Sequence, residues 1–268
     1  AEETLSQKEL SQLEVAQSEI RYRNVKQLQV RHLNFAYPDG KQILKDISFK
    51  AEKGQMIGIT GPVACGKSTL GKVFLCEYPY EGQILVDGKE LQNIAPSWQM
   101  NIIGYLGHDP ELFNDSVENN VLLGDSKSSD TYLNAACMKQ EVAEMTDGKN
   151  TLIGSGGAYL SGGQAKRLAF ARTMCHDKPI LILDDPFSAL DKNTEKQAFV
   201  NLQALAKDSI VLLISHRLYL FPEMDGVIWM ENGKAVTGTH EELLKTVPEY
   251  EKPVYIASPY HRERRCRT

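Results

Sequence analysis

The chain has 268 residues, of which 42% are hydrophobic and 24% charged, and its formal net charge is −5. These proportions are ordinary for a soluble globular protein, and the negative charge argues against a global basic field that binds nucleic acid or acidic membranes. The five cysteines include no C-x-x-C pair, which argues against a zinc site or a disulfide framework. No apolar run approaches the roughly 18 residues of a membrane span. We therefore expect any span to lie on another chain or outside this one.

The N-terminal third of the chain opens with a polar stretch and then reads as β-structure. Residues 1–26 are rich in Glu and Gln, and we expect a linker there. From Gln27 to Ala36 polar and apolar residues alternate, with a slip in phase after Val30. This predicts a strand, and the turn Pro38-Asp39-Gly40 with a second strand over residues 43–49 predicts an antiparallel hairpin.

Strands and helices alternate along the remainder, which predicts an α/β core. We expect a helix from Lys67 to about Cys76 and a mostly helical block from about residue 116 to 176, inserted between core strands. Residues 248–268 carry four arginines near their end, and we expect a mobile tail. Further strands are expected at residues 55–60, 83–86, 102–106, 179–183 and 210–214, with a final hairpin formed by 227–230 and 234–236.

A phosphate-binding loop follows the strand at residues 55–60. Residues 61–68 fit the pattern G-x-x-x-x-G-K-[ST] at every fixed position. The glycines let successive N–H groups turn inward, and the helix that follows adds the positive end of its dipole. Lys67 is then expected to reach the β- and γ-phosphates and Ser68 to bind Mg²⁺. The alternative, a glycine-rich turn with an exposed lysine, fits this strand–loop–helix context poorly. The expected loop consists of Gly61, Pro62, Val63, Ala64, Cys65, Gly66, Lys67, Ser68 and Thr69.

Two acids end the apolar strand at residues 179–183. Asp184 and Asp185 stand where ligands gather in a parallel sheet, beyond the carboxyl ends of the strands. We expect Asp184 to hold the magnesium shell and Asp185 to face the attacking water. Alone, this pair would read as a solvated turn. A phosphate loop on the same sheet favours the functional interpretation.

The segment Leu160-Ser161-Gly162-Gly163-Gln164 is similar to the LSGGQ signature of ATP-binding cassette (ABC) ATPases. Ser161 and the two glycines precede a helix, so they offer a cap, free N–H groups and a dipole to an anion. An ordinary Ser-capped helix is the alternative. Together with the phosphate loop and Asp184, the segment makes the chain resemble this family over roughly residues 27–247. The resemblance implies a P-loop NTPase core with a mixed or parallel sheet, an antiparallel β subdomain and an inserted helical subdomain.

The resemblance also implies roles for individual residues and for a partner. Tyr37 would stack on adenine, and His216 would contact the γ-phosphate of ATP. Residues 188–191 would cross a dimer interface. ATP and Mg²⁺ would be held by residues 61–69 of one domain and closed by Ser161, Gly162, Gly163 and Gln164 of a second. The implied catalytic residues are Lys67, His108, Asp185 and His216, and the implied magnesium ligands are Ser68, His108 and Asp184.

The chain departs from the family pattern at positions that bear on catalysis. Asp185 replaces the usual glutamate, which draws the carboxylate back by about 1.5 Å, one carbon–carbon bond. A misplacement of about 1 Å can cost on the order of a hundredfold in rate. His108 replaces the usual glutamine of the Q-loop, and Gly154-Ser155-Gly156-Gly157 replaces a segment that usually carries Glu and Arg. We expect the chain's own site to bind ATP well and hydrolyse it slowly.

Residues 99–121 resemble the exporter form of the family, and the phosphate loop is close to that of the multidrug-resistance-associated and cystic-fibrosis regulator branch. This implies an ATPase domain on the cytoplasmic face of a membrane. Its partners would be a second nucleotide-binding domain, identical or different, and transmembrane domains that this chain lacks. No nucleic acid is expected. Two alternatives stay open: a soluble ABC ATPase, and a regulatory module that dimerises on ATP without turnover.

Overall fold

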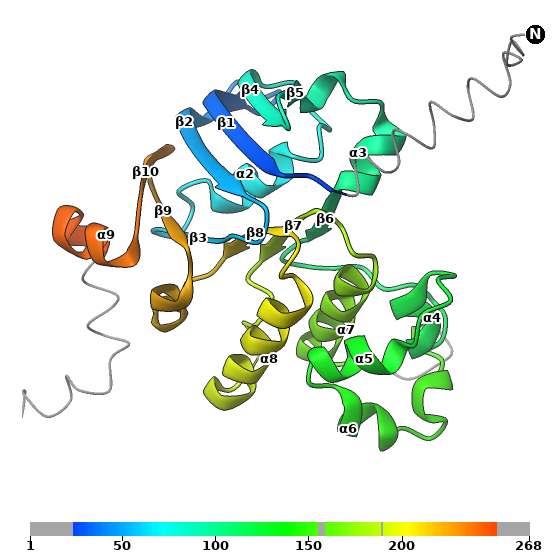
Figure 1. The fold of residues 1–268 in the computed structure, drawn as a ribbon. Coiled ribbons are helices and arrows are strands. Elements are labelled where there is room, and N and C mark those ends of the chain that lie inside the picture. The colour runs from blue at the N-terminus through cyan, green and yellow to red at the C-terminus, as the bar shows by residue number, and fades with distance from the viewer. Residues whose placement is uncertain (1–23, 155–158, 189, 251–268) are drawn as a thin grey trace, which may run out of the picture.

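Two β-sheets and a helical lobe make up the fold in a computed structural model, which describes residues 24–154, 159–188 and 190–250 (Figure 1). The first sheet is antiparallel, with strand order β2-β1-β4-β5. The hairpin predicted around residues 38–40 is its β1–β2 pair. The phase slip of the sequence is a β-bulge in β1, where His32 has φ +48° between the buried Val30 and Leu33. The strands are β1 (Gln27–Ala36), β2 (Gln42–Glu52), β4 (Glu81–Val86) and β5 (Lys89–Glu90).

The second sheet has the order β10-β9-β3-β8-β7-β6, in which the five strands from β9 to β6 run parallel and β10 pairs antiparallel with β9. Strands β3, β7 and β8 are buried at every position, as expected for a parallel sheet covered on both faces. The β9–β10 hairpin turns at Asn232 and Gly233, whose φ values of +51° and +80° are those of a type I′ turn. The strands are β3 (Met56–Thr60), β6 (Ile103–Leu106), β7 (Ile180–Asp184), β8 (Ile210–Ile214), β9 (Gly226–Glu231) and β10 (Lys234–Gly238).

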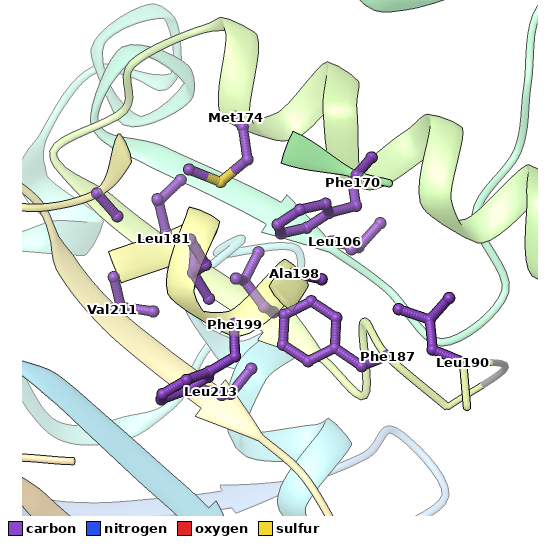
Figure 2. Close-up of a cluster of buried hydrophobic side chains, with 14 of the residues drawn as sticks. Leu106, Phe170, Met174, Leu181, Phe187, Leu190, Ala198, Phe199, Val211 and Leu213 are labelled. Atoms are coloured by element: carbon purple, nitrogen blue, oxygen red, sulfur yellow. The ribbon is translucent and has the colours of Figure 1, made fainter. Parts of the chain in front are cut away.

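Helices fill the space between the sheets and cover the far face of the second sheet (Figure 1). Helix α2 lies between the sheets, within one apolar core. A second core joins the other face of the sheet to α7 and α8 (Figure 2). No helix of the described ranges is long and apolar enough to cross a membrane. The α-helices are α2 (Lys67–Val73), α3 (Pro96–Ile102), α4 (Val117–Leu122), α5 (Ser129–Ala135), α6 (Lys139–Ala143), α7 (Gly162–Cys175), α8 (Lys192–Leu205) and α9 (His240–Thr246), and the 3₁₀ turns are η1 (Leu91–Asn93), η2 (Gly148–Asn150) and η3 (Leu218–Glu223).

The structure confirms the predicted α/β fold, with its antiparallel β subdomain and inserted helical subdomain, and corrects several boundaries. Helix α2 ends at Val73 rather than near Cys76. Val25 is buried, so the predicted linker ends before residue 26. Tyr250 is also buried, because its ring packs edge-on against Trp229 and its hydroxyl lies 2.6 Å from Nδ1 of His240. The packed chain therefore extends past residue 248. Residues 1–23 and 251–268 of the predicted linker and tail lie outside the described residues.

Candidate nucleotide site

Four parallel strands bring the predicted site residues to one edge of the sheet. The phosphate loop follows β3, His108 follows β6, Asp184 and Asp185 come at the end of β7, and His216 follows β8. Because these strands are parallel, their carboxyl ends meet at this edge. The charges on Lys67, Asp184, Asp185 and His108 all act on the imidazole of His216. The structure therefore gathers these five side chains around one point.

The loop over residues 61–66 has the backbone that its glycines allow. Gly61 has φ +149°, and a Cβ there would lie 2.0 Å from the carbonyl oxygen of Met230. Gly66 has φ +107° and immediately precedes α2. Lys67 is only 6% exposed, and its ammonium donates to the carbonyl oxygens of Gly61 (3.0 Å) and Pro62 (2.7 Å). The cation therefore lies inside the curl of the loop, where a phosphate would meet it.

The buried carboxylate of Asp184 is suited to bind a cation. Its side chain is 3% exposed, and its Oδ2 is buried without a hydrogen-bond partner among the described residues. An unpaired buried oxygen of this kind costs about 1–3 kcal/mol, so it fits a ligand that is absent from the chain itself. Ser68 is exposed at the start of α2. The described residues contain no cluster of three or more His, Cys, Asp or Glu able to hold a metal, and Mg²⁺ commonly takes one or two carboxylates together with phosphate oxygens.

The surroundings of His216 disfavour its protonated form. Partial loss of hydration, together with the positive charge of Lys67, lowers the pKa of His216 below its usual value. Asp184 and Asp185 act in the opposite direction and do not outweigh these effects. A cavity of about 360 Å³ adjoins the ring, lined also by Gly61, Pro62, Val63 and Trp229 among others. The imidazole is thus a neutral base beside an open space.

Tyr37, the predicted adenine platform, lies just beyond β1 and is half-buried. Its ring makes edge-on contacts with Phe35 (centroids 5.0 Å apart) and with Tyr78 (6.0 Å). The aromatic ring therefore lies at the end of a strand of the antiparallel sheet, held by neighbouring rings.

The signature residues cap helix α7, as the sequence predicted for a Ser-capped helix. Ser161 Oγ accepts a hydrogen bond from the Gln164 amide (3.2 Å), and Gln164 Oε1 accepts one from the Ser161 amide (2.9 Å). Glu141 supports this end from α6, because it binds Gln164 Nε2 and pairs with both terminal nitrogens of Arg167. Ser161 and Gly162 are exposed. The hydrogen bonds of Ser161 and Gln164 in the described chain thus run within the helical lobe, not to the phosphate loop. The segment at residues 154–157, which departs from the family pattern, lies outside the described residues except for Gly154.

A family profile described as "ABC transporter" matches residues 44–188, more than half of the chain. The chain belongs to the ABC transporter family. The ATP-dependent lipid A-core flippase of Burkholderia pseudomallei is 38% identical over 226 residues, which cover 81% of this chain and 38% of the flippase. The Toxin RTX-I translocation ATP-binding protein of Actinobacillus pleuropneumoniae is 37% identical over 221 residues, 80% of this chain and 31% of that protein. A solved bacterial Atm1-family ABC exporter with ATP bound matches with a TM-score of 0.80 at 29% identity, covering 86% of this chain and 42% of its own.

These matches confirm the resemblance to the nucleotide-binding domain of exporters and the P-loop NTPase fold. The ABC chain spans about two fifths of the length of the flippase and of the solved exporter. Its branch within the family stays a prediction.

Sequence reasoning missed the residues that hold the loop between β7 and α8 of this ABC domain. Arg217, next to His216, donates to the carbonyl oxygens of Ser188 (2.7 Å) and Leu190 (2.9 Å). The guanidinium also pairs with Glu195, which is fully buried and accepts a hydrogen bond from Tyr219. A partial signal existed, since Asp191 caps α8 and Glu195 lies one turn along it. Arg217, the partner of Glu195, lies 22 residues further along the chain, and no local pattern connects the two.

Proposed function

We propose that this chain binds MgATP on residues 61–69 and works as one half of an ATP-bridged dimer that powers or gates transport across a membrane. The observation that carries the proposal is that two groups lie at the same sheet edge: Lys67, enclosed by the loop, and an Asp184 oxygen that is buried without a hydrogen-bond partner among the described residues. A phosphate and a cation would satisfy both groups at once. The exporter relatives support the transport role.

Each residue of the edge has a task in this proposal. The amides of residues 61–69 and the Lys67 ammonium bind the phosphates, and Tyr37 stacks on the base. Ser68, Asp184 and His108 hold the magnesium shell, and the bound metal neutralises phosphate charge. Asp185 orients the attacking water. His216 donates a hydrogen bond from its imidazole N–H to a γ-phosphate oxygen.

A second nucleotide-binding domain would complete each site. Ser161 and Gly162 are exposed at the start of α7, and their hydrogen bonds keep to the helical lobe. The Ser161 amide is already bonded to Gln164, so the glycine N–H groups, the Ser161 hydroxyl and the helix dipole would close on an ATP that another domain holds. The second domain is an identical or a different chain. Transmembrane domains of the transporter would place both on the cytoplasmic face, and no nucleic acid takes part.

We infer that hydrolysis at the chain's own site is slow, because Asp185 is one methylene shorter than glutamate and His108 replaces glutamine. The same two departures favour one alternative, a regulatory module that dimerises on ATP without turnover. The membrane flippase and exporter among the relatives favour the transporter over a soluble ABC ATPase.

Three measurements on the purified chain test the proposal. Calorimetry with MgATP should show binding, light scattering should show ATP-dependent pairing alone or with candidate partner domains, and phosphate release should report turnover of the pair. Binding and pairing with no phosphate release in any combination would select the regulatory module. Absence of heat on adding millimolar ATP to folded protein would end the proposal.

A further inference from the structure

Ser188 is held by two cations that come from two different elements. Lys166 of α7 donates from Nζ to Ser188 Oγ at 3.0 Å, and Arg217 donates from Nη2 to the Ser188 carbonyl oxygen at 2.7 Å. Lys166 follows the signature segment by two residues, and Arg217 follows His216 directly. One residue of the β7–α8 loop therefore connects the end of the chain's own nucleotide site to the helix that carries its signature.

The burial of Lys166 is the unusual part of this arrangement. The side chain is only 6% exposed, and the hydrogen bond that the structure gives it is to a neutral hydroxyl rather than a carboxylate. An ammonium taken out of water without a counter-charge is costly, and Lys is almost never fully buried unless it is paired. Packing alone would be served better by an apolar side chain of the same length. We therefore assign the Lys166 ammonium the role of holding Ser188.

A buried acid on α8 fixes the guanidinium of Arg217. Glu195 on α8 is fully buried and pairs with the guanidinium, while Tyr219 donates to the same carboxylate. This fixes the guanidinium plane, so that Nη2 reaches the carbonyl oxygen of Ser188, while Nη1, which also contacts Glu195, reaches that of Leu190. A movement of the backbone at His216 would thus carry the loop with it.

The loop is also anchored to α7 through apolar packing. The Phe187 ring meets the Phe170 ring edge to face, with centroids 5.5 Å apart, and Leu190 is buried beside them (Figure 2). Phe170 lies one turn of α7 beyond Lys166, on the same face. Helix α7 thus contacts this loop through a polar bond to Ser188 and an aromatic contact to Phe187.

We propose that Lys166 and Arg217 form a two-cation clamp on Ser188 that couples occupancy of the chain's own phosphate loop to the position of its own signature cap. ATP at residues 61–69 sets His216 and Arg217, Arg217 sets Ser188, and Lys166 transmits that position to the first turn of α7. Lys166 is a positioning residue: it contacts neither phosphates nor metal. The proposal rests on the proposed function, because bound ATP is the signal.

Amide hydrogen exchange on the full chain, with and without MgATP, tests the clamp at a dilution where light scattering shows no ATP-dependent pairing, because pairing would itself protect the signature. In the parent chain ATP should slow exchange in peptides covering residues 61–70 and also 160–168. In Lys166→Met the slowing at 61–70 and its ATP midpoint should persist, while the slowing at 160–168 should fall about fivefold or more, the lower end of typical coupling between sites. Lys166→Arg should restore it, since a longer cation can still reach Ser188 Oγ.

Controls separate the clamp from stability and from the function itself. Ser188→Ala removes the hydroxyl without touching α7, so it tests the clamp even if Lys166→Met does not fold. Lys196→Met changes an exposed lysine of the neighbouring helix α8 and should behave as the parent chain. Equal ATP-dependent slowing at 160–168 in the parent, Lys166→Met and Ser188→Ala, or none in the parent, would overturn the clamp alone. No slowing at 61–70 in the parent would overturn the proposed function.

Discussion

The amide of Asp185 donates to the carbonyl oxygen of Ile214 at 2.9 Å, which ties the second acid after β7 to the strand that leads into His216. Asp185 has φ +52°, a conformation in which Asp and Asn are enriched over other non-glycine residues. The backbone at this point is thus fixed. How far the carboxylate reaches toward a bound nucleotide then depends on side-chain length.

Asp185→Glu should accelerate phosphate release by ATP-paired domains. The added methylene extends the carboxylate by about 1.5 Å. Because a misplacement of about 1 Å can lower a rate on the order of a hundredfold, we expect hydrolysis to become about tenfold faster or more. The left-handed backbone should cost the variant up to about 1–2 kcal/mol of unfolding free energy, a shift that a thermal melt would detect. Asp185→Asn is the control, because it keeps the length and removes the charge, and it should not gain. A fast parent chain that the glutamate leaves unchanged would contradict the slow-site hypothesis.

Lys67→Met should weaken ATP binding about tenfold or more, as measured by calorimetry. The ammonium lies inside the curl of the loop, where it would donate to a phosphate, and hydrogen bonds to charged groups are worth about 1.5–3 kcal/mol, where about 1.4 kcal/mol is tenfold in affinity. Lys72→Met is the matched control, since Lys72 is exposed on the same helix. Equal losses in both variants would show that the loop lysine has no special role.

The core strands and the loop motif were predictable because their signals are local. A run of buried apolar residues identifies β7 and β8, and the phase slip after Val30 marks the bulge at His32. The phosphate loop and the acids of β7 could be placed on one edge, since parallel strands end together. What the sequence predicted best was therefore fixed by neighbours in the chain or by the strand direction.

Contacts between distant segments had no such signal. Lys166 and Ser188 are 22 residues apart, on a helix and a loop, and no periodic pattern relates them. Helix α9 begins with a capping box at Thr239 and Glu242, a local sign that sequence reasoning could have used. Tyr250 belongs to the core because it packs against Trp229 from β9 and against His240 from α9. Such packing decides where the domain ends, and composition alone does not show it.

The imidazole of His216 should titrate below the usual histidine pKa in the free chain, as followed by NMR. Partial loss of hydration is the larger cause and the charge of Lys67 the second, so Lys67→Met should raise the pKa of His216. The sign for stability follows: the unfolded chain holds the proton more tightly, so this group's contribution is present above pH 6.5 and is lost as the pH falls through and below it.

Bound ATP should raise the pKa of His216, because the γ-phosphate is negative. The bound state then holds more protons than the free state, so affinity for ATP should increase as the pH falls through this range. Calorimetry in two buffers of different ionisation enthalpy would measure the proton uptake. ATP itself also takes up a proton in this range, and His216→Gln removes only the protein's share. Identical uptake by parent and variant would contradict a contact between His216 and the γ-phosphate.

Glu195→Ala should lower the free energy of unfolding by about 2 kcal/mol. The carboxylate is fully buried, and its removal leaves Arg217 and Tyr219 without their shared acceptor, a loss of about 1–3 kcal/mol for each group left unpaired in a dry site. Arg217 is partly exposed and can turn to water, so the cost should stay below the 3–5 kcal/mol typical of breaking a fully buried pair. Urea unfolding would measure this loss of stability, with Glu223→Ala, an exposed glutamate of η3, as the neutral control.

In a double-mutant cycle with Arg217→Ala the two losses of unfolding free energy should not add, because both variants remove the same ion pair. Additive losses would mean that Glu195 stabilises α8 by itself and does not fix the arginine that holds Ser188.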